Sequence, residues 1–293
     1  MIDRRHGMIG AAAGLLAGLA RGAAAEGGLD ALPPRFARIE AEHGGRLGVS
    51  VLDTGTGRQA GHRPTERFPM CSTFKALLSA AVLARVDGGG ERLDRRIRIA
   101  RSDIIAWSPI TETRLGGEGM TVAELCAATM TLSDNAAANL LLAAVGGPAG
   151  LTAWLRGTGD QVTRLDRTEP TLNEALPGDP RDTTTPAAMA ATLGRLALGD
   201  VLSAASRAQF VTWLRGNRTG DARLRAGLPA GWQVGDRTGT GARGTSNVIG
   251  VMWPPGGRAP LVVTAFLTEG APVAAQRDAA LAAVGAAITG TIG

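Results

Sequence analysis

The hydrophobic pattern of the chain changes twice along its length, and this constrains the fold more than any other feature of the sequence. Residues 47–51 (LGVSV) alternate apolar and small side chains, which is typical of a strand. Similar patterns return only at 231–238, 246–253 and 260–267, and the stretch between follows helical periods. The simplest fold is α/β plus all-α: one antiparallel sheet built from both ends of the chain and flanked by helices, with an inserted helical domain.

Eight segments of the chain have the apolar spacing of a helix. They are 31–43, 72–87, 121–130, 134–145, 149–156, 184–198, 203–215 and 273–289. A second short strand is expected to end near His62. We therefore place the α/β domain in residues 26–66 and 216–293, and the all-α domain in residues 67–215.

The first 25 residues are typical of an export signal. Arg4 and Arg5 precede an apolar run over residues 8–20, and residues 23–25 (AAA) offer a cleavage site before Glu26. The run is too short for a permanent membrane span, and no later segment reaches the roughly 18 uninterrupted apolar residues that a span needs. We expect an exported protein, periplasmic or secreted. The arginine pair suggests the twin-arginine route, with a Sec signal as the alternative.

Composition argues against several classes of function. The net charge is +5, but the 31 basic residues are scattered, aromatic residues make up only 3% and there is no Tyr, so nucleic-acid binding is not expected. His43 and His62 are isolated, which argues against a metal site. Residues 239–244 match G-x-G-x-x-G, yet a strand pattern follows them where a dinucleotide site needs a helix. We expect no cofactor and no metal.

A single lysine stands among the 31 basic residues, and it is three positions after a serine. On a helix, Ser72 and Lys75 would share a face, so the Ser72 hydroxyl and the Lys75 amine could meet. A serine is a weak nucleophile until a base takes its proton, and Lys, unlike Arg, can lose its own proton. A position at a helix N-terminus would favour the negative charge that develops in such a reaction.

Three further motifs are each weak when taken alone. Ser133-Asp134-Asn135 is also a common helix N-cap. Arg237-Thr238-Gly239 ends a strand pattern, where the arginine and threonine could hold a carboxylate and the glycine allows a close approach to the backbone. Glu169 to Asn173 lie inside residues 163–183, a stretch without a period that contains three prolines. A loop of that length is usually functional, and its glutamate could act as a general base.

Taken together and in this order, the motifs resemble those of the class A β-lactamases. The resemblance runs from about Arg35 to Ile288 and includes FPMCSTFK (68–75), MTVAELCAATMTLSDNAAANLLL (120–142), RLDRTEPTLNEALPGDPRDTTTP (164–186) and LRAGLPAGWQVGDRTGTG (224–241). It implies hydrolysis of the β-lactam amide bond of penicillins and cephalosporins through a serine acyl-enzyme. It also implies a monomer whose partner is a small-molecule β-lactam.

The resemblance implies catalytic roles residue by residue. Ser72 is similar to the acylated nucleophile, and Lys75 to the buried amine that helps to deprotonate it. Ser133 resembles the hydroxyl that passes a proton to the lactam nitrogen. Glu169, with Asn173, resembles the pair that activates the hydrolytic water. Whether Lys75 or Glu169 is the base for acylation stays open.

The resemblance also implies residues that bind substrate. Asn135 would bind the side-chain amide of the substrate, and Arg237 and Thr238 its carboxylate. The backbone N–H groups of Ser72 and Thr240 would form the oxyanion hole. Further implied positions are Trp107 at the mouth of the cleft, the pair Arg167 and Asp182 bracing the loop, and Arg223 as a second guanidinium for the carboxylate. Ser246 stands where many members carry that second arginine.

The two cysteines, Cys71 and Cys126, occupy positions that form disulfides in some members, but their partner positions are Gly241 and Ser79 here. We therefore predict two free thiols. Two alternatives share most of the motifs, namely a D-Ala-D-Ala peptidase and a non-catalytic penicillin-binding sensor domain. Both would lack the deacylating water, so the Glu169 to Asn173 motif argues against them.

Overall fold

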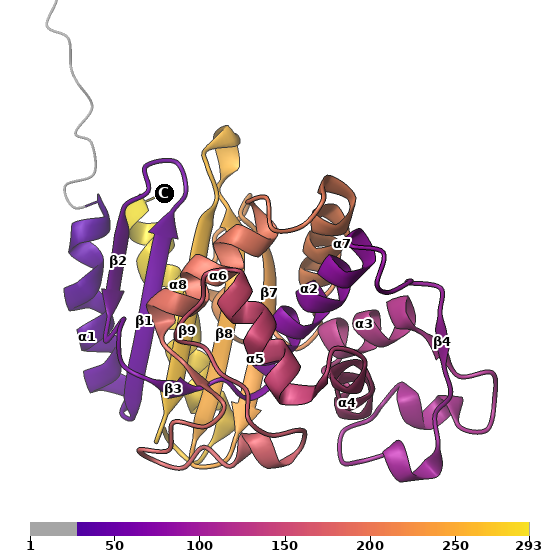
Figure 1. The fold of residues 1–293 in the computed structure, drawn as a ribbon. Helices are drawn as coiled ribbons and strands as arrows, with labels where there is room; N and C mark the ends of the chain where they lie inside the picture. Colours follow the sequence, from indigo (N-terminus) through magenta and orange to yellow (C-terminus); the bar gives the residue numbers. More distant parts are fainter. Residues whose placement is uncertain (1–27, 293) are drawn as a thin grey trace, which may run out of the picture.

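The computed structural model describes residues 28–292 of the chain, and its centre is a five-stranded antiparallel sheet (Figure 1). The strands are β1 (Arg46–Asp53), β2 (Gln59–His62), β7 (Gln233–Gly241), β8 (Thr245–Trp253) and β9 (Leu261–Thr268), in the order β2-β1-β9-β8-β7. Because β1 pairs with β9 along its whole length, the two ends of the chain meet in the sheet. The predicted sheet built from both ends is confirmed.

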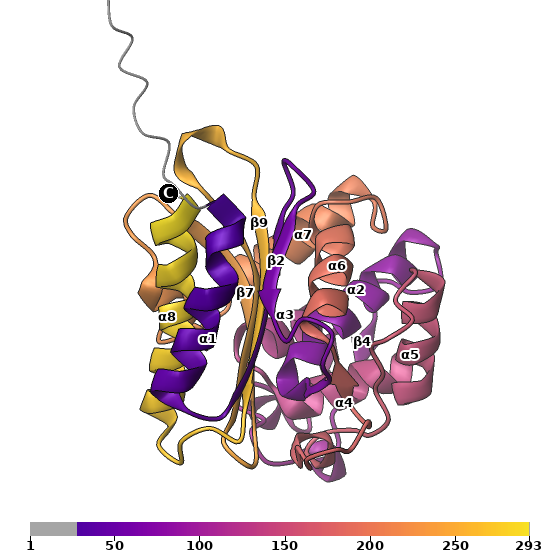
Figure 2. The ribbon, with the colours of Figure 1, turned by 90° about the vertical axis from the view of Figure 1, so that its left-hand side faces the viewer.

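Helices cover both faces of this sheet (Figure 2). On one face lie α1 (Leu32–His43) and α8 (Ala274–Ile292), and on the other lie α6 (Pro186–Ala197) and α7 (Ala204–Arg215). Side chains of β8 alternate between two cores: Val248 and Met252 pack with α1 and α8, whereas Ile249 and Val251 pack with the helices of the other face. A strand buried on both sides in this way carries few polar side chains unless each has a partner.

The remaining helices lie between β3 and α6 in the chain and belong to the inserted helical region. They are α2 (Phe74–Asp87), α3 (Val122–Thr131), α4 (Asn135–Ala144) and α5 (Gly147–Gly157). The helix α2 is central, since every side chain from Phe74 to Leu83 is buried. Lys75 therefore enters the interior of the protein with the first turn of this helix. The assignment of domain boundaries at residues 66 and 215 stays a prediction.

Short elements complete the chain. They are β3 (Phe68–Pro69), β4 (Arg96–Ile97), β5 (Met120–Thr121), β6 (Thr183–Thr184) and the 3₁₀ turns η1 (Gly28–Ala31), η2 (Cys71–Thr73), η3 (Arg101–Asp103), η4 (Thr111–Arg114), η5 (Thr171–Asn173), η6 (Leu224–Gly227) and η7 (Pro255–Gly257). Pairing of β3 with β6 brings the end of the predicted loop beside the segment that precedes Ser72.

Other predictions have outcomes in the fold. The G-x-G-x-x-G segment forms the end of β7 and the turn to β8, so no helix follows it to receive a dinucleotide. Within residues 28–292, no single helix has the length and apolar character that a membrane crossing needs, and one bent pair, α4 with α5, meets both only jointly. The predicted export signal over residues 1–25 lies outside the described residues.

Candidate active site

Ser72 lies in the 3₁₀ turn η2, immediately before α2, and this turn is pressed against the sheet. A Cβ atom at Gly239 of β7 would lie 2.7 Å from the carbonyl oxygen of Met70 and 3.2 Å from the nitrogen of Ser72. The glycine of the Arg237-Thr238-Gly239 motif is therefore needed for close approach of the serine turn to the strand. The sequence predicted that Gly239 allows a close approach to its backbone. In the structure, the group that approaches is the serine turn of the protein itself.

The ammonium group of Lys75 is fully buried and lies among four oxygen atoms. Its Nζ is 3.0 Å from Oε1 of Glu169, 2.9 Å from the carbonyl oxygen and 3.2 Å from the hydroxyl of Ser133, and 2.5 Å from Oδ1 of Asn135. Burial lowers the pKa of Lys75 to about 8, against the opposing effect of the Glu169 carboxylate. Lys75 is thus mostly protonated at pH 7, yet much closer to losing its proton than an ordinary lysine.

The hydroxyl of Ser72 donates to Oε1 of Glu169 at 3.2 Å. We expected the Ser72 hydroxyl to meet the Lys75 amine, but within residues 28–292 the two are joined through Glu169 and have no direct hydrogen bond. The spacing argument assumed an α-helix, whereas Ser72 precedes α2 in a 3₁₀ turn. A carboxylate from the loop, which is buried, then occupies the position between them.

Glu169 is held from two directions. Asn173 donates from Nδ2 to Oε2 of Glu169 at 2.5 Å, which brings the two predicted loop residues together. Asn139 of α4 clamps the backbone of Glu169, since its Nδ2 donates to the carbonyl oxygen at 2.9 Å and its Oδ1 accepts the N–H at 3.0 Å. Asn139 was not predicted as a site residue, although its spacing of four residues from Asn135 places both on one helix face.

The predicted ion pair at the base of the loop is present. Nε of Arg167 lies 2.6 Å from Oδ2 of Asp182, and Oδ1 of Asp182 accepts the backbone N–H groups of Asp166 and Arg167 at 2.8 and 2.9 Å. Because Asp182 is buried and bonded to the chain sixteen residues earlier, it ties the two ends of the loop together. Glu169 and Asn173 lie between these tied ends.

Ser133 receives hydrogen bonds from two cations. Lys75 and Nη2 of Arg237 both donate to its Oγ. A hydroxyl has one proton and two lone pairs, so these bonds occupy the lone pairs and leave the proton of Ser133 for a third partner. Ser133 lines the cleft, which means that this proton can be directed at a bound molecule.

Arg237 is fully buried behind the hydroxyl groups of the cleft. Its Nη1 donates to Oγ1 of Thr219 at 3.2 Å, and Thr238 lies at the limit of hydrogen-bond distance at 3.5 Å. Burial lowers the pKa of Arg237 to about 10, so the guanidinium still carries its charge at neutral pH. The structure therefore places its charge behind Ser133, Thr219 and Thr238, and Arg237 is not among the residues that line the cleft.

These side chains surround one cleft of about 380 Å³, a size suited to a small molecule. Its lining comprises Ser72, Trp107, Ser133, Asn135, Asn173, Thr219, Arg223, Thr238, Gly239 and Thr240. Trp107 stands at the cleft with 64% of its surface exposed, and its ring N–H donates to the carbonyl oxygen of Leu132 at 2.9 Å. The amide of Asn135 already bonds Lys75 and the carbonyl oxygen of Ala106.

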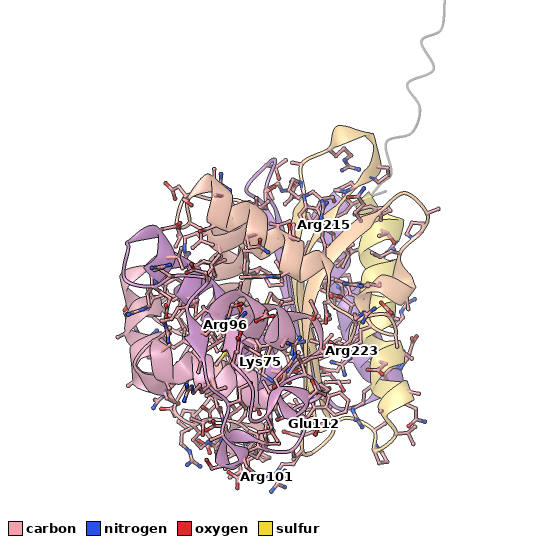
Figure 3. All side chains as sticks on the ribbon, turned by 90° about the vertical axis from the view of Figure 1, so that its right-hand side faces the viewer. Lys75, Arg96, Arg101, Glu112, Arg215 and Arg223 are labelled. Carbon is pink, nitrogen blue, oxygen red and sulfur yellow. The ribbon has the colours of Figure 1, made fainter. Side chains whose placement is uncertain are left out.

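Arg223 reaches the cleft from the sheet side, whereas Lys75 approaches from the helical side (Figure 3). Nε of Arg223 donates to Oδ1 of Asp278 at 2.8 Å, and its Nη2 donates to the hydroxyl of Thr240 at 2.7 Å. Its Nη1 donates to the carbonyl oxygens of Gly239 and Asn247, both at 2.8 Å. Four of the five N–H groups of the guanidinium are thus engaged, and one on Nη2 remains. Only 8% of Arg223 is exposed.

Two residues of α8 at this side of the cleft were missed by the sequence analysis. Asp278 pairs with Arg223, and Arg277 donates from Nε to the hydroxyl of Ser246 at 3.0 Å. Ser246, which is buried and is not among the residues that line the cleft, is therefore itself bonded to a buried guanidinium. No motif in the sequence links α8 to the strands, so neither contact carried a signal.

Both cysteines are free, as predicted, and both are buried. Burial raises the pKa of each thiol well above its usual range. A Cβ atom at Gly241 would lie 2.6 Å from Sγ of Cys71, so the thiol faces a position that has no side chain. Within residues 28–292, no cluster of three or more His, Cys, Asp or Glu residues is placed to hold a metal ion.

The sheet built from both chain ends, the inserted helices and the serine, lysine and glutamate around one cleft define an active-site serine enzyme with the serine β-lactamase fold. A sequence model of the family described as "Beta-lactamase enzyme family" matches residues 31–292. The chain belongs to this family.

Named relatives agree with this assignment. The chain is 53% identical to Beta-lactamase L2 of Stenotrophomonas maltophilia over 85% of this chain and 82% of that protein. It is 48% identical to Beta-lactamase OXY-2 of Klebsiella oxytoca over 98% of this chain and 97% of that protein. Each of these comparisons spans most of both proteins.

Solved structures show the same likeness. An ancestral class A β-lactamase, reconstructed as the last common ancestor of Gram-negative bacteria, is 66% identical, with a TM-score of 0.87 over 88% of this chain and 99% of that chain. The putative class A β-lactamase PenP of Rhodopseudomonas palustris is 61% identical, with a TM-score of 0.87 over 89% and 99%.

Proposed function

We propose that this β-lactamase hydrolyses penicillins and cephalosporins through an acyl-enzyme on Ser72. The observation that carries the proposal is the position of Glu169, whose carboxylate accepts from the Ser72 hydroxyl and from Asn173 and also touches Lys75. One carboxylate can thus serve both the nucleophile and an attacking water. Peptidases and sensors of the related fold would lack the second function.

In acylation, Oγ of Ser72 attacks the lactam carbonyl carbon and its proton passes to Oε1 of Glu169. As the carbon–nitrogen bond breaks, the hydroxyl proton of Ser133 goes to the lactam nitrogen. Lys75 restores the proton of Ser133 and takes one from Glu169, over distances of 3.2 and 3.0 Å. One proton has then moved from Ser72 to the lactam nitrogen, and each relay group has returned to its initial state. This assigns the base for acylation to Glu169, with Lys75 as a relay.

In deacylation, Glu169 takes a proton from a water that attacks the acyl carbonyl carbon, and Asn173 orients the carboxylate. The proton then returns to Oγ of Ser72 as the ester bond breaks, which releases the carboxylic acid product. The clamp of Asn139 and the ion pair of Arg167 with Asp182 hold Glu169 in place for this step. A base for water must be fixed to within hydrogen-bond reach, which explains why the loop is tied at both ends.

Binding of the substrate uses the sheet side of the cleft. The backbone N–H groups of Ser72 and Thr240 form the oxyanion hole, and Thr238 and the remaining N–H of Arg223 bind the substrate carboxylate. Arg237 supports them with charge through the hydroxyl groups. Asn135 contacts the side-chain amide of the substrate, and Trp107 packs against the molecule at the mouth.

The test is repeated hydrolysis of a chromogenic cephalosporin by the purified mature chain. We expect many turnovers per molecule of enzyme, and expression in a sensitive bacterium should raise resistance to benzylpenicillin. A single stoichiometric burst followed by a stable acyl-enzyme would instead assign the protein to the peptidases or sensors.

We also propose that residues 1–25 direct export to the periplasm or medium through the twin-arginine route. Arg4 and Arg5 before an apolar run support this. N-terminal sequencing of the mature protein should begin at Glu26, and replacing both arginines by lysine should block export. Export that persists in the double variant would assign the signal to the Sec route. We propose a monomer, which is what the resemblance to the class A β-lactamases implies.

A further inference from the structure

Asn247 of β8 joins the sheet to the turn that carries the nucleophile. Its side chain is fully buried, and its Nδ2 donates to the carbonyl oxygens of Pro69 and Met70 at 2.9 and 3.0 Å. Both partners are acceptors, so the amide nitrogen must face them. Oδ1 of Asn247 has no hydrogen-bond partner within residues 28–292, which leaves these two bonds as the contribution of this side chain.

The two carbonyl groups belong to the residues three and two positions before Ser72. In the sheet, Asn247 lies opposite Gly239, where the absence of a side chain lets the turn approach β7. Gly239 permits this approach but offers no side chain to hold it. The amide of Asn247 supplies hydrogen bonds at that point, between segments that are 177 and 178 residues apart.

An oxyanion hole made of Ser72 and Thr240 takes one N–H from the turn and one from β7. Their separation depends on how the turn lies on the strand, because η2 and β7 are distant in the chain. Donors in such a site must be placed to within fractions of an ångström of the developing charge. A displacement of about 1 Å can lower a reaction rate about 100-fold.

We propose that Asn247 is a positioning residue that holds the Ser72 turn against β7 and so sets the spacing of the two oxyanion donors. This inference rests on the proposed function, in which Ser72 is acylated. Asn247 touches neither the substrate nor the reacting atoms, and it does not line the cleft. Its effect is therefore on the rate of acylation and on the hydrogen bonds to the acyl carbonyl group.

The test compares two variants with a control on the same strand. Asn247→Leu keeps the shape and removes both donors. Asn247→Asp places a carboxyl group in a buried site that favours the protonated form, so one O–H donor remains. Thr245→Val is the control, since the Thr245 hydroxyl is equally buried but bonds the hydroxyl of Thr268 and not the turn.

With benzylpenicillin, kcat/KM should fall roughly 10- to 100-fold in Asn247→Leu, by less in Asn247→Asp, and hardly at all in Thr245→Val. The acyl carbonyl stretch is then measured by infrared spectroscopy in a Glu169→Gln background, where the acyl-enzyme accumulates. Weaker hydrogen bonds to this carbonyl should raise its frequency in Asn247→Leu, with a smaller rise in Asn247→Asp and no change in Thr245→Val.

A purely structural role would lower thermal stability in both Asn247→Leu and Thr245→Val and leave the rate and the carbonyl frequency unchanged, which would overturn the proposal. If Asn247→Leu does not fold, wild-type values in Asn247→Asp would overturn it equally. Absence of β-lactam turnover by the wild-type enzyme would reject the proposed function and, with it, this inference. Turnover by the wild type with unchanged variants rejects the inference alone.

Discussion

The two walls of the cleft are built from different kinds of group. The helical wall and its loop link Ser72 to Glu169, Glu169 to Lys75 and Lys75 to Ser133 by polar contacts, and a carboxylate and an amine can exchange protons. The sheet wall presents hydroxyl groups and the guanidinium of Arg223, with the Arg237 guanidinium behind them. Proton transfer needs groups whose pKa can be tuned, whereas binding of a permanent anion needs cations that stay charged. Proton transfer therefore falls to the helical wall, and binding of the substrate carboxylate falls to the sheet wall.

The most severe test removes the nucleophile from the helical wall. Ser72→Ala should lower turnover of benzylpenicillin by at least about 10⁴-fold, because no other hydroxyl in residues 28–292 is bonded to Glu169. Binding of intact benzylpenicillin, measured by calorimetry, should persist because the sheet wall is unchanged. Turnover near the wild-type level would refute the assignment of Ser72.

Glu169→Gln should lower kcat by roughly 10²- to 10⁴-fold. Deacylation should suffer more than acylation. Loss of the Glu169 carboxylate removes an effect that raises the pKa of Lys75, so the neutral amine becomes available as a substitute base for acylation, whereas the hydrolytic water loses the base that Asn173 orients. Intact-protein mass spectrometry should therefore show a persistent penicilloyl adduct. An inactive protein that stays unmodified would mean that no other group can replace Glu169 as the base for acylation.

Arg223→Ala tests the sheet wall and should act mainly through KM. A charge-assisted hydrogen bond contributes about 1.5–3 kcal/mol, so kcat/KM for benzylpenicillin should fall roughly 10- to 150-fold. Arg215→Ala is the control, since that arginine stacks on Trp253 and lies apart from Lys75 and Arg223 in Figure 3. A fall that appears in kcat alone would break the division of labour between the walls.

The smallest expected effect is a difference in stability against pH. The pKa of Lys75 is lowered from 10.5 to about 8 by folding, so between these values the unfolded chain holds a proton that the folded protein lacks. The contribution of Lys75 to the free energy of unfolding should therefore rise with pH across this window. Urea unfolding of Lys75→Met at pH 8 and pH 10 should lack this contribution.

Few other groups of this chain titrate in the same pH window, so the difference between the wild type and Lys75→Met reports on Lys75. There is one lysine and no tyrosine, so the other groups that titrate in this window are the two thiols, the N-terminal amine and Arg237, whose pKa is lowered to about 10. These are present in both proteins, and their contributions cancel in the difference. Equal slopes for the two proteins would show that Lys75 keeps an ordinary pKa.

The order of elements and most of the site residues could be read from the sequence. Apolar periods and helix caps depend on near neighbours in the sequence. Two such caps are present in the structure: Thr185 before Pro186 at the start of α6, and the capping box of Thr121 with Glu124 at the start of α3. The motifs around Ser72, Ser133, Glu169 and Arg237 were visible for the same reason, since each is a few consecutive residues. Such local motifs can be recognised in the sequence without knowledge of the tertiary contacts that their residues make.

Tertiary structure alone decided how these pieces touch. The hydrogen bond of Ser72 to Glu169 spans 97 residues, that of Arg237 to Ser133 spans 104, and that of Arg223 to Asp278 spans 55. Asn139 and Asn247 are ordinary residues of a helix and a strand until folding places a carbonyl group beside each amide. Burial and the approach of charges set a pKa and the direction of a hydroxyl, and both depend on segments that only the folded chain brings together.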